Sequence, residues 1–328
     1  MGFSEIVGHK RQLDTLRQGL LNGRLHHAYI FVGPDGVGKR TLALALARAI
    51  YCAAGDGDFC GNCGPCVAVQ NGNHADVRIL QPLAGKKEIT IQQVRELEKE
   101  LALRSFSGIK KVAIVDPAAL MNWPAQNALL KTLEEPPQDC LLILIAASAG
   151  GLLPTVRSRA FSLSFSVLPK RIVSEYLISK GRTQEHAEFL AALSMGSLGA
   201  ASKIEHEKLI EKRRGWMEIL SSLNVKDYRG ALAAAEGLAG DRDETLSFLE
   251  WAAIWYRDLL TFRVAHDREE IINLDLLEQI KEQSVESDEN HLFSLIAKTA
   301  EASRLIQRNA NRRMVIEDLL LDVVEKRS

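Results

Sequence analysis

Two sets of residues in this sequence have the types and spacing that site chemistry requires, and they lie close together in the chain. Residues 33–39 are Gly-Pro-Asp-Gly-Val-Gly-Lys, which matches the pattern of a phosphate-binding loop. The second set is a group of cysteines shortly downstream, Cys52, Cys60, Cys63 and Cys66. A phosphate loop alone indicates only a large class of nucleotide-binding folds. A cysteine-rich insert after its first helix narrows that class, so the combination is more informative than either part.

The glycine loop predicts a site for the phosphates of a nucleotide. Its glycines would let backbone N–H groups close around phosphate oxygens, and the N-terminus of the next helix would add a favourable partial charge. The residues expected to contact phosphate are Gly33, Gly36, Gly38 and Lys39. The lysine would reach the outer phosphates.

The residues that would hold Mg²⁺ and activate water are altered. Arg40 occupies the position of the metal-binding Ser or Thr, and Thr41 is one residue out of phase. Asp116 ends an apolar run, as a metal-holding carboxylate of such folds does, but Pro117 follows it where an active ATPase usually has a Glu. We therefore expect a poor hydrolase or none. The loop is either a degenerate site for ATP and Mg²⁺, which would include Thr41 and Asp116, or an empty loop that only shapes the fold.

The cysteine spacing indicates a metal site. The four cysteines follow one another at intervals of seven, two and two residues, and four thiolates suit a tetrahedral Zn²⁺ with no open position for catalysis. The sequence therefore predicts a structural zinc module at about residues 52–66, with tight turns at residues 61–62 and 64–65. An iron–sulfur cluster is an alternative, but its ferredoxin pattern needs a further cysteine where Gln70 stands. Plain buried thiols are the third interpretation.

The segment 155–159, Thr-Val-Arg-Ser-Arg, is a further candidate for nucleotide chemistry. Arg157 and Arg159 are either surface arginines on a loop, or one of them is an arginine finger. An arginine finger is a planar cation offered to the phosphates in a neighbouring subunit. Spacing alone does not choose between these interpretations.

The elements that must position these residues alternate between strand and helix in the first half of the chain. Short apolar runs predict strands at residues 28–32, 77–80, 111–115, 141–146 and 161–165. Amphipathic or Ala- and Leu-rich stretches predict helices at residues 40–52, 89–103 and 123–134. This alternation predicts a parallel sheet covered on both faces, with ligands at the carboxyl ends of the strands.

Beyond about residue 166 the strand signal disappears and helical patterns follow to the end of the chain. Leu246, Leu249, Ala253, Tyr256 and Leu260 form one apolar stripe at helical spacing, and Ile316, Leu319, Leu320 and Val323 form another. We expect these stripes to pack a helical bundle, with Trp251 and Trp255 in its core. The best boundaries are near residues 166 and 205.

Composition excludes several classes of protein. The 328 residues are 46% hydrophobic and 25% charged, with a formal net charge of −1, which argues against a protein that coats nucleic acid by charge alone. No apolar run reaches membrane-spanning length, and the N-terminus has no signal-peptide pattern. Five cysteines, four of them clustered, favour metal binding in a reducing cytoplasm over a disulfide framework.

Several segments carry a family resemblance. Residues 127–137, Asn-Ala-Leu-Leu-Lys-Thr-Leu-Glu-Glu-Pro-Pro, closely resemble the signature of bacterial clamp-loader ATPases, as do residues 6–9 and 24–29. The cysteine insert, the altered metal and base positions and the retained Ser158-Arg159 resemble the delta-prime subunits of the DNA polymerase III clamp loader. The resemblance is strong over residues 1–200 and general over the helical remainder.

The resemblance implies an architecture and a set of partners. It implies a AAA+ domain with the zinc module over residues 1–165, a small helical lid over 166–204 and an all-α collar over 205–328. The collar would pack in a ring with other loader subunits. The implied function is to help load the sliding clamp onto primed DNA during replication. The implied partners, reached through the complex, are motor subunits of the gamma/tau type, a delta-type subunit, the sliding clamp and primer-template DNA.

The resemblance also implies roles for single residues. Arg159 matches the arginine that completes the ATP site of the adjacent motor subunit in trans, and Ala160 replaces a cysteine that does no chemistry there. Ala200 stands where active members often have an arginine that contacts the γ-phosphate, a third change toward an inactive site. The resemblance thus implies a non-motor subunit. Nothing in the sequence resembles the paired-carboxylate metal site of a polymerase.

Two alternatives remain open from the sequence. An active gamma/tau-like motor ATPase would need Thr41 or a water to replace the missing hydroxyl, and a distant base to replace Pro117. A phosphotransferase built on the phosphate loop would leave the long helical C-terminus without an evident use.

Overall fold

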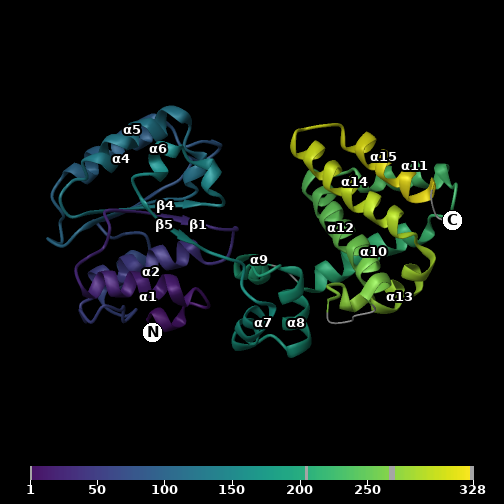
Figure 1. Cartoon of the computed structure of the whole chain (residues 1–328), viewed down its shortest axis with the longest axis horizontal. Coiled ribbons are helices and arrows are strands. Elements are labelled where there is room, and N and C mark those ends of the chain that lie inside the picture. The colour runs from purple at the N-terminus through teal and green to yellow at the C-terminus, as the bar shows by residue number, and fades with distance from the viewer. Residues whose placement is uncertain (1, 204–205, 266–269, 326–328) are drawn as a thin grey trace. The chain divides into compact units, whose positions relative to one another are not determined.

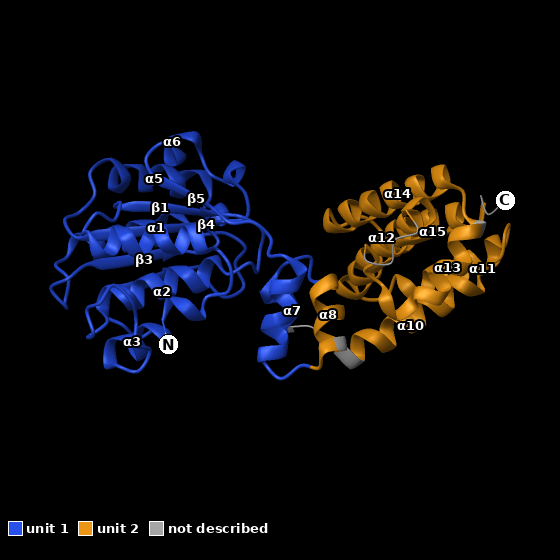
Figure 2. Cartoon of the chain, turned by 60° about the horizontal axis from the view of Figure 1, so that its bottom comes forward, with its two compact units in different colours: residues 1–182, 194–203 blue, residues 183–193, 204–328 orange. Residues whose placement is uncertain are grey.

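The chain forms two compact units (Figure 1). The computed structural model describes residues 2–203, 206–265 and 270–325. The first unit comprises residues 2–182 and 194–203, and the second comprises residues 183–193 and the described residues from 206 onward (Figure 2). The three-domain division expected from the sequence stays a prediction, and its boundary at residues 204–205 lies outside the described residues.

A parallel sheet forms the centre of the first unit. Its strand order is β2-β3-β4-β1-β5. The strands are β1 (Ala28–Val32), β2 (Val77–Leu80), β3 (Lys111–Val115), β4 (Cys140–Ala146) and β5 (Phe161–Ser164). The prediction of a parallel α/β fold is therefore confirmed.

Helices cover both faces of this sheet, and Figure 1 shows the two layers. One layer contains α1 (Lys10–Leu21), α2 (Lys39–Tyr51) and α3 (Gly64–Gln70), and the other contains α4 (Ile91–Ala102), α5 (Trp123–Glu134) and the short α6 (Pro154–Arg157). Successive side chains of a strand point to opposite faces. In β1, Tyr29 and Phe31 therefore join the core under the first layer, and Ala28 and Ile30 join the core under the second.

Local signals in the sequence set the ends of the helices in the second layer. Thr90 and Gln93 form a capping box at the start of α4, which satisfies two backbone N–H groups. Asn122 caps α5 by accepting a hydrogen bond from the backbone N–H of Ala125 at 3.0 Å. α5 ends at Glu134, shortly before two prolines that cannot continue a helix.

The other regular elements of the described residues are helices and 3₁₀ turns. The first unit also contains α7 (Lys170–Ser179), α9 (Leu198–Lys203) and the 3₁₀ turns Phe3–Glu5, Ala118–Leu120 and Ala149–Gly151. The second unit contains α8 (Gln184–Leu193), α10 (His206–Ser222), α11 (Tyr228–Leu238), α12 (Arg242–Ala265), the 3₁₀ turn Leu274–Leu276, α13 (Leu277–Glu286), α14 (Glu289–Gln307) and α15 (Arg312–Glu325). Trp251 and Trp255 of α12 are buried in its core, as predicted.

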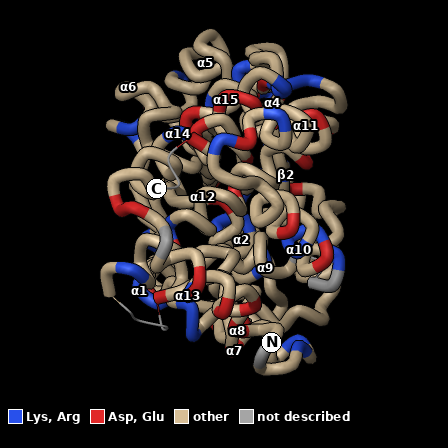
Figure 3. The backbone as a smooth tube through the Cα atoms, turned by 90° about the vertical axis from the view of Figure 1, so that its right-hand side faces the viewer, with Lys and Arg blue, Asp and Glu red and all other residues tan. Residues whose placement is uncertain are grey.

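Charge is spread along the described chain. Lys and Arg positions and Asp and Glu positions are both scattered along the chain (Figure 3), in keeping with the net charge of −1. Among the described residues, we find no helix with both the length and the apolar character needed to cross a membrane.

Candidate functional site

The glycine loop lies at the carboxyl ends of the parallel strands, where ligands of such folds bind. It connects β1 to α2, and Gly38 is the N-cap residue of α2. His9 anchors the loop, because its Nε2 lies 2.8 Å from the carbonyl oxygen of Val37. The ring of His9 is buried and packs against Phe165 with 4.9 Å between ring centroids.

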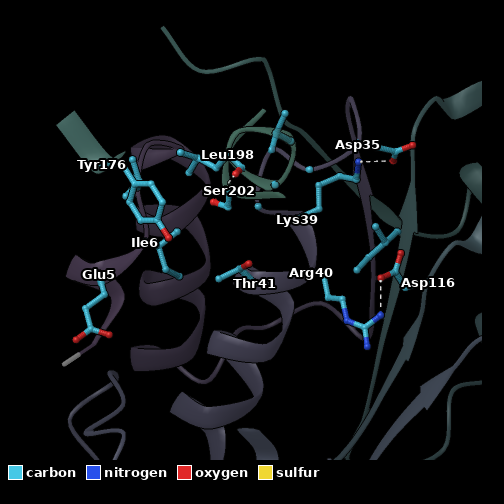
Figure 4. Close-up of a pocket in the computed structure, with 16 residues that line it drawn as sticks. Glu5, Ile6, Asp35, Lys39, Arg40, Thr41, Asp116, Tyr176, Leu198 and Ser202 are labelled. Atoms are coloured by element: carbon cyan, nitrogen blue, oxygen red, sulfur yellow. Dashed lines mark hydrogen bonds and ion pairs between the residues drawn. The ribbon is translucent and has the colours of Figure 1, made fainter. Parts of the chain in front are cut away.

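A cavity of about 410 Å³ opens beside the loop (Figure 4). Of the residues expected to bind nucleotide, those that line it are Gly36, Gly38, Lys39, Thr41 and Asp116. Gly33 is not among the lining residues, although its carbonyl oxygen accepts a hydrogen bond from the loop lysine. The structure therefore brings together most of the predicted nucleotide site.

Lys39 is turned back onto its own loop. Its side chain is only 5% exposed, and its Nζ donates to the carbonyl oxygens of Gly33 and, at 2.7 Å, of Pro34. The exposed Asp35 carboxylate lies 3.5 Å from the same nitrogen. The ammonium group is thus satisfied by protein atoms and would have to release them to contact a phosphate.

The start of α9 and the residue before it are attached directly to the glycine loop. Ser197 Oγ donates to the carbonyl oxygen of Asp35 at 3.0 Å. The backbone N–H of Gly199 donates to the carbonyl oxygen of Gly36 at 2.8 Å. Gly36 has a φ of 74°, and a Cβ there would lie 2.2 Å from Ser197 Oγ. Only glycine fits such a contact, so the loop requires glycine here for packing as well as for its conformation.

Arg40 forms an ion pair with the carboxylate that was expected to hold a metal. Its Nη1 lies 3.2 Å from Oδ2 of Asp116, and the two side chains are 43% and 16% exposed. In Figure 4 Arg40 extends from the first turn of α2 toward Asp116 at the end of β3, whereas the neighbouring Thr41 does not approach it. Pro117 follows the carboxylate and offers no base.

These residues do not fit Mg²⁺. The ion prefers an octahedron of oxygen ligands, and in phosphate-loop proteins a loop hydroxyl supplies one of them. Here a guanidinium lies against Asp116, and a divalent cation beside it would be repelled. The arrangement can attract phosphate through Lys39, Arg40 and the start of α2, but it lacks the groups for metal-assisted attack by water.

Arg159 lies on a turn between α6 and β5. Its Nη1 donates to the carbonyl oxygen of Thr155 at 3.1 Å and to Ser158 Oγ at 3.2 Å. Its Nη2 lies 2.6 Å from Oε1 of Glu134, with the two side chains 37% and 51% exposed. The guanidinium is thus held in place but open to solvent, while Arg157 is exposed. Sequence reasoning assigned no such role to Glu134, since no spacing rule connects it to residue 159.

The turn that carries Arg159 and the glycine loop lie at opposite edges of the sheet, the first where the strands begin and the second where they end. Because β5 and β1 are parallel, with Phe161 paired to Tyr29, residues before Phe161 lie at the amino edge. The glycine loop follows Val32, three residues further along β1, which is about 10 Å at 3.3 Å per residue. Arg159 is not among the residues that line the cavity. Its guanidinium therefore faces away from this chain's own candidate nucleotide site.

The four predicted cysteines come together after α2. Their sulfur atoms all lie within 4.8 Å of one another. Cys52 is the C-cap residue of α2, and Gly61, with a φ of 75°, makes the turn between the next two cysteines. The turn expected at residues 64–65 is wrong, because Gly64 is the first residue of α3 and Cys63 is its N-cap. Proline is tolerated in the first turn of a helix, where its missing N–H has no partner to lose.

The surroundings of the sulfurs differ from one cysteine to the next. Backbone N–H groups donate to Cys52 Sγ at 3.2 Å and to Cys60 Sγ at 3.4 Å. Hydrogen bonding with the backbone of Ala53 lowers the pKa of Cys63 to about 6, whereas burial raises the pKa of Cys66 to about 12. A metal would supply the charge that lets the buried thiol ionise. Tetrahedral ligation by four thiolates at about 2.3 Å from Zn²⁺ is compatible with the observed clustering.

Two family profiles match this chain. The profile described as "DNA polymerase III, delta subunit" matches residues 8–169, and the profile described as "DNA polymerase III, delta subunit, C terminal" matches residues 207–325. Both the sheet-containing part and the helical part are thus similar to proteins of one kind.

Curated relatives match over nearly the whole chain. The "DNA polymerase III subunit delta'" of Pseudomonas aeruginosa is 32% identical over 314 residues, covering 92% of this chain and 93% of the relative. The protein of the same name from Escherichia coli K12 is 30% identical over 307 residues, covering 92% and 90%. That from Bacillus subtilis is 28% identical over 320 residues, covering 96% of each.

Proposed function

Because this chain belongs to the family of delta-prime subunits of the DNA polymerase III clamp loader, we propose that it is a non-motor subunit whose Arg159 completes the nucleotide site of a neighbouring ATPase subunit. The family resemblance inferred from the sequence is confirmed by these matches. The family matches do not assign a role to Arg159, and that part of the proposal depends on the geometry of the first unit.

One observation carries the proposal: Arg159 lies at the edge of the sheet opposite the chain's own glycine loop. A guanidinium at the amino edge does not reach phosphates at the carboxyl edge. Arginine presents a planar fork of donors that matches phosphate oxygens, so its natural ligand would be a phosphate group of another molecule.

The contacts of Arg159 suit a cation that must change partners. Its ion pair with Glu134 is solvent-exposed, and such pairs contribute about 0.2–1 kcal/mol. Glu134 can therefore orient the guanidinium and still be displaced by a more strongly charged triphosphate. The hydrogen bonds to Thr155 and Ser158 would keep the side chain in place during that exchange.

The chain's own cavity supports the non-motor part of the proposal. Arg40 pairs with Asp116, and the next residue is a proline, so a metal site and a base are both missing from the expected positions. Within the part of the chain that the structure describes, no specific contact favours the gamma/tau-like motor alternative. Sustained ATP turnover by the isolated chain would support that alternative over ours.

The cysteine cluster is proposed to hold a structural Zn²⁺ through Cys52, Cys60, Cys63 and Cys66. All four positions would be occupied by protein ligands, so the ion would take no part in a reaction. It would fix the end of α2 and the start of α3.

The partners follow from the family. We expect this chain to assemble with motor subunits of the gamma/tau type and with a delta-type subunit. Through that complex it would contact the sliding clamp and primer-template DNA. Within the assembly its tasks are to brace the ring and to offer Arg159.

The test is Arg159→Ala in the reconstituted loader. We expect DNA-dependent ATP turnover at the site that Arg159 completes to fall on the order of 10³-fold, with assembly unchanged in gel filtration. Arg157→Ala is the matched control, because it removes a neighbouring exposed arginine, and it should leave turnover near normal. Full turnover by the Arg159→Ala loader would refute the assignment.

A further inference from the structure

The first unit contains an internal cation at the position where Mg²⁺ would be expected. We propose that the cavity beside the glycine loop binds a nucleoside diphosphate or triphosphate without Mg²⁺, with the Arg40 guanidinium in place of the metal. This proposal concerns the chain's own cavity and does not depend on the role of Arg159.

The first step is the position of the charge. Arg40 follows the loop lysine directly, and its Nη1 lies 3.2 Å from Asp116 Oδ2. Its side chain is 43% exposed, so part of the guanidinium remains open to the cavity that it lines. A guanidinium has five N–H donors, and one carboxylate cannot accept hydrogen bonds from all of them. The remaining donors can contact phosphate oxygens while the pair with Asp116 persists.

The second step is the exclusion of the metal. Mg²⁺ bound to a nucleotide would have to approach Asp116 through the space that the guanidinium occupies. It would also meet no hydroxyl at position 40. The metal complex of a nucleotide is therefore a poorer ligand than the bare polyphosphate, whose charge Lys39 and Arg40 can neutralise together.

The third step is the shape of the cavity, which has two different ends. Its charged end is formed by the loop with Asp35, Lys39 and Arg40, and its other end is lined by Ile6, Tyr176 and Leu198 together with Glu5 and Ser202 (Figure 4). Its volume of about 410 Å³ lies within the 300–1,000 Å³ common for small-molecule sites. An end that offers both apolar and polar side chains, opposite an end with two cations, suits a nucleoside polyphosphate better than a free phosphate ion.

Binding would have a structural consequence. Lys39 would leave the carbonyl oxygens of Gly33 and Pro34 for phosphate, and the loop would keep its hydrogen bonds to Ser197 and Gly199. The ligand would thus bind to a loop that stays attached to Ser197 and to the start of α9. It would not be cleaved, because the activating groups are missing.

The experiment is a titration of the isolated full chain with fluorescently labelled ADP and ATP, in EDTA and in Mg²⁺. We expect saturable binding in EDTA that Mg²⁺ leaves unchanged or weakens. In Arg40→Thr, which restores a hydroxyl, we expect Mg²⁺ to strengthen binding tenfold or more. With Mn²⁺ in place of Mg²⁺, electron paramagnetic resonance should detect nucleotide-dependent metal binding in Arg40→Thr and none in the unmodified chain.

Three controls separate the outcomes. Lys39→Ala should abolish saturable binding, and circular dichroism should show that each variant is folded. Arg159→Ala should bind as the unmodified chain does, so failure of this proposal and failure of the arginine-finger proposal are distinguishable. The proposal is overturned if the unmodified chain binds nucleotide tenfold more tightly with Mg²⁺, or shows no saturable binding in either buffer. It is also overturned if Arg40→Thr gains no dependence on Mg²⁺.

Discussion

The two edges of one sheet each carry an arginine–carboxylate pair, and the two pairs have opposite consequences. At the carboxyl edge, Arg40 pairs with Asp116, a carboxylate that is 16% exposed and ends a buried strand. At the amino edge, Arg159 pairs with Glu134, which is 51% exposed at the end of a helix. The first pair occupies a position where a metal would bind. The second leaves a guanidinium available to another molecule.

The comparison shows that an arginine's use depends on which carboxylate holds it. Burying an unpaired charge costs free energy, so a shielded carboxylate is stable only beside a cation. We therefore expect the ion pair between Asp116 and Arg40 to persist. An exposed carboxylate is solvated by water when its partner leaves, so Glu134 can release Arg159 at little cost. The same residue type can thus block one site and complete another.

The largest expected effect comes from metal removal, which should act on one face of the sheet and not on the other, because the cysteine cluster packs under the first layer and the turn of Arg159 lies with the second. α2 runs from Lys39 at the cavity to the cysteine cluster, and a structural zinc site contributes on the order of 10 kcal/mol. We expect a strong chelator to raise hydrogen exchange over residues 46–70 while residues 155–163 stay protected. Measurement by mass spectrometry would separate the two faces. Equal loss of protection at both would show that the sheet depends on the metal as a whole.

The next effect tests whether Arg159 acts by its shape or only by its charge. Arg159→Lys keeps the positive charge but loses the planar fork of donors. We expect loader turnover at the neighbouring site to fall at least about tenfold, with a smaller loss than in Arg159→Ala. Steady-state ATP hydrolysis in the presence of primed DNA measures this. A lysine variant with full activity would mean that a point charge is sufficient.

A smaller effect is expected from the carboxylate at the amino edge. Glu134→Gln keeps the side-chain shape and removes the charge that orients Arg159, while the contacts to Thr155 and Ser158 remain. Loss of an exposed ion pair should lower turnover by about two- to fivefold. Glu135→Gln, one residue along, is the matched control. An unchanged or faster rate in Glu134→Gln would show that this carboxylate does not position the arginine.

The sheet was predictable because its strands are buried on both faces. Such strands are continuous apolar runs, and the structure differs from the predicted strand ranges by one residue at two ends, where β4 begins at Cys140 and β5 ends at Ser164. The cysteine cluster was predictable from spacing, since sulfur ligands three residues apart can meet at one centre. The local path of the backbone between the cysteines was not predictable. Gly64 and Pro65 suit a turn, but they suit the first turn of a helix equally well, and here they begin α3.

The two arginine–carboxylate ion pairs could not be predicted from the sequence. Arg40 and Asp116 lie 76 residues apart, and each was noticed only as a departure from a motif or a match to one. Their contact depends on parallel pairing that places the end of β3 near the first turn of α2. Glu134 and Arg159 meet because α5 and α6 cover the same face of the sheet. Periodicity fixes each element separately and does not give the side-chain pairs between elements.

The smallest expected effect is at the carboxyl edge, where Asp116→Ala should change loader turnover by less than about twofold. Arg40 is 43% exposed, so water can solvate its guanidinium when the carboxylate is gone, and no metal ligand is lost if Arg40 already holds that position. The assay is the same steady-state ATP hydrolysis with primed DNA. A loss as large as that in Arg159→Ala would mean that Asp116 does hold a metal in the assembled loader. The two edges would then both be working sites, and Arg40 would have to move aside to let the ion bind.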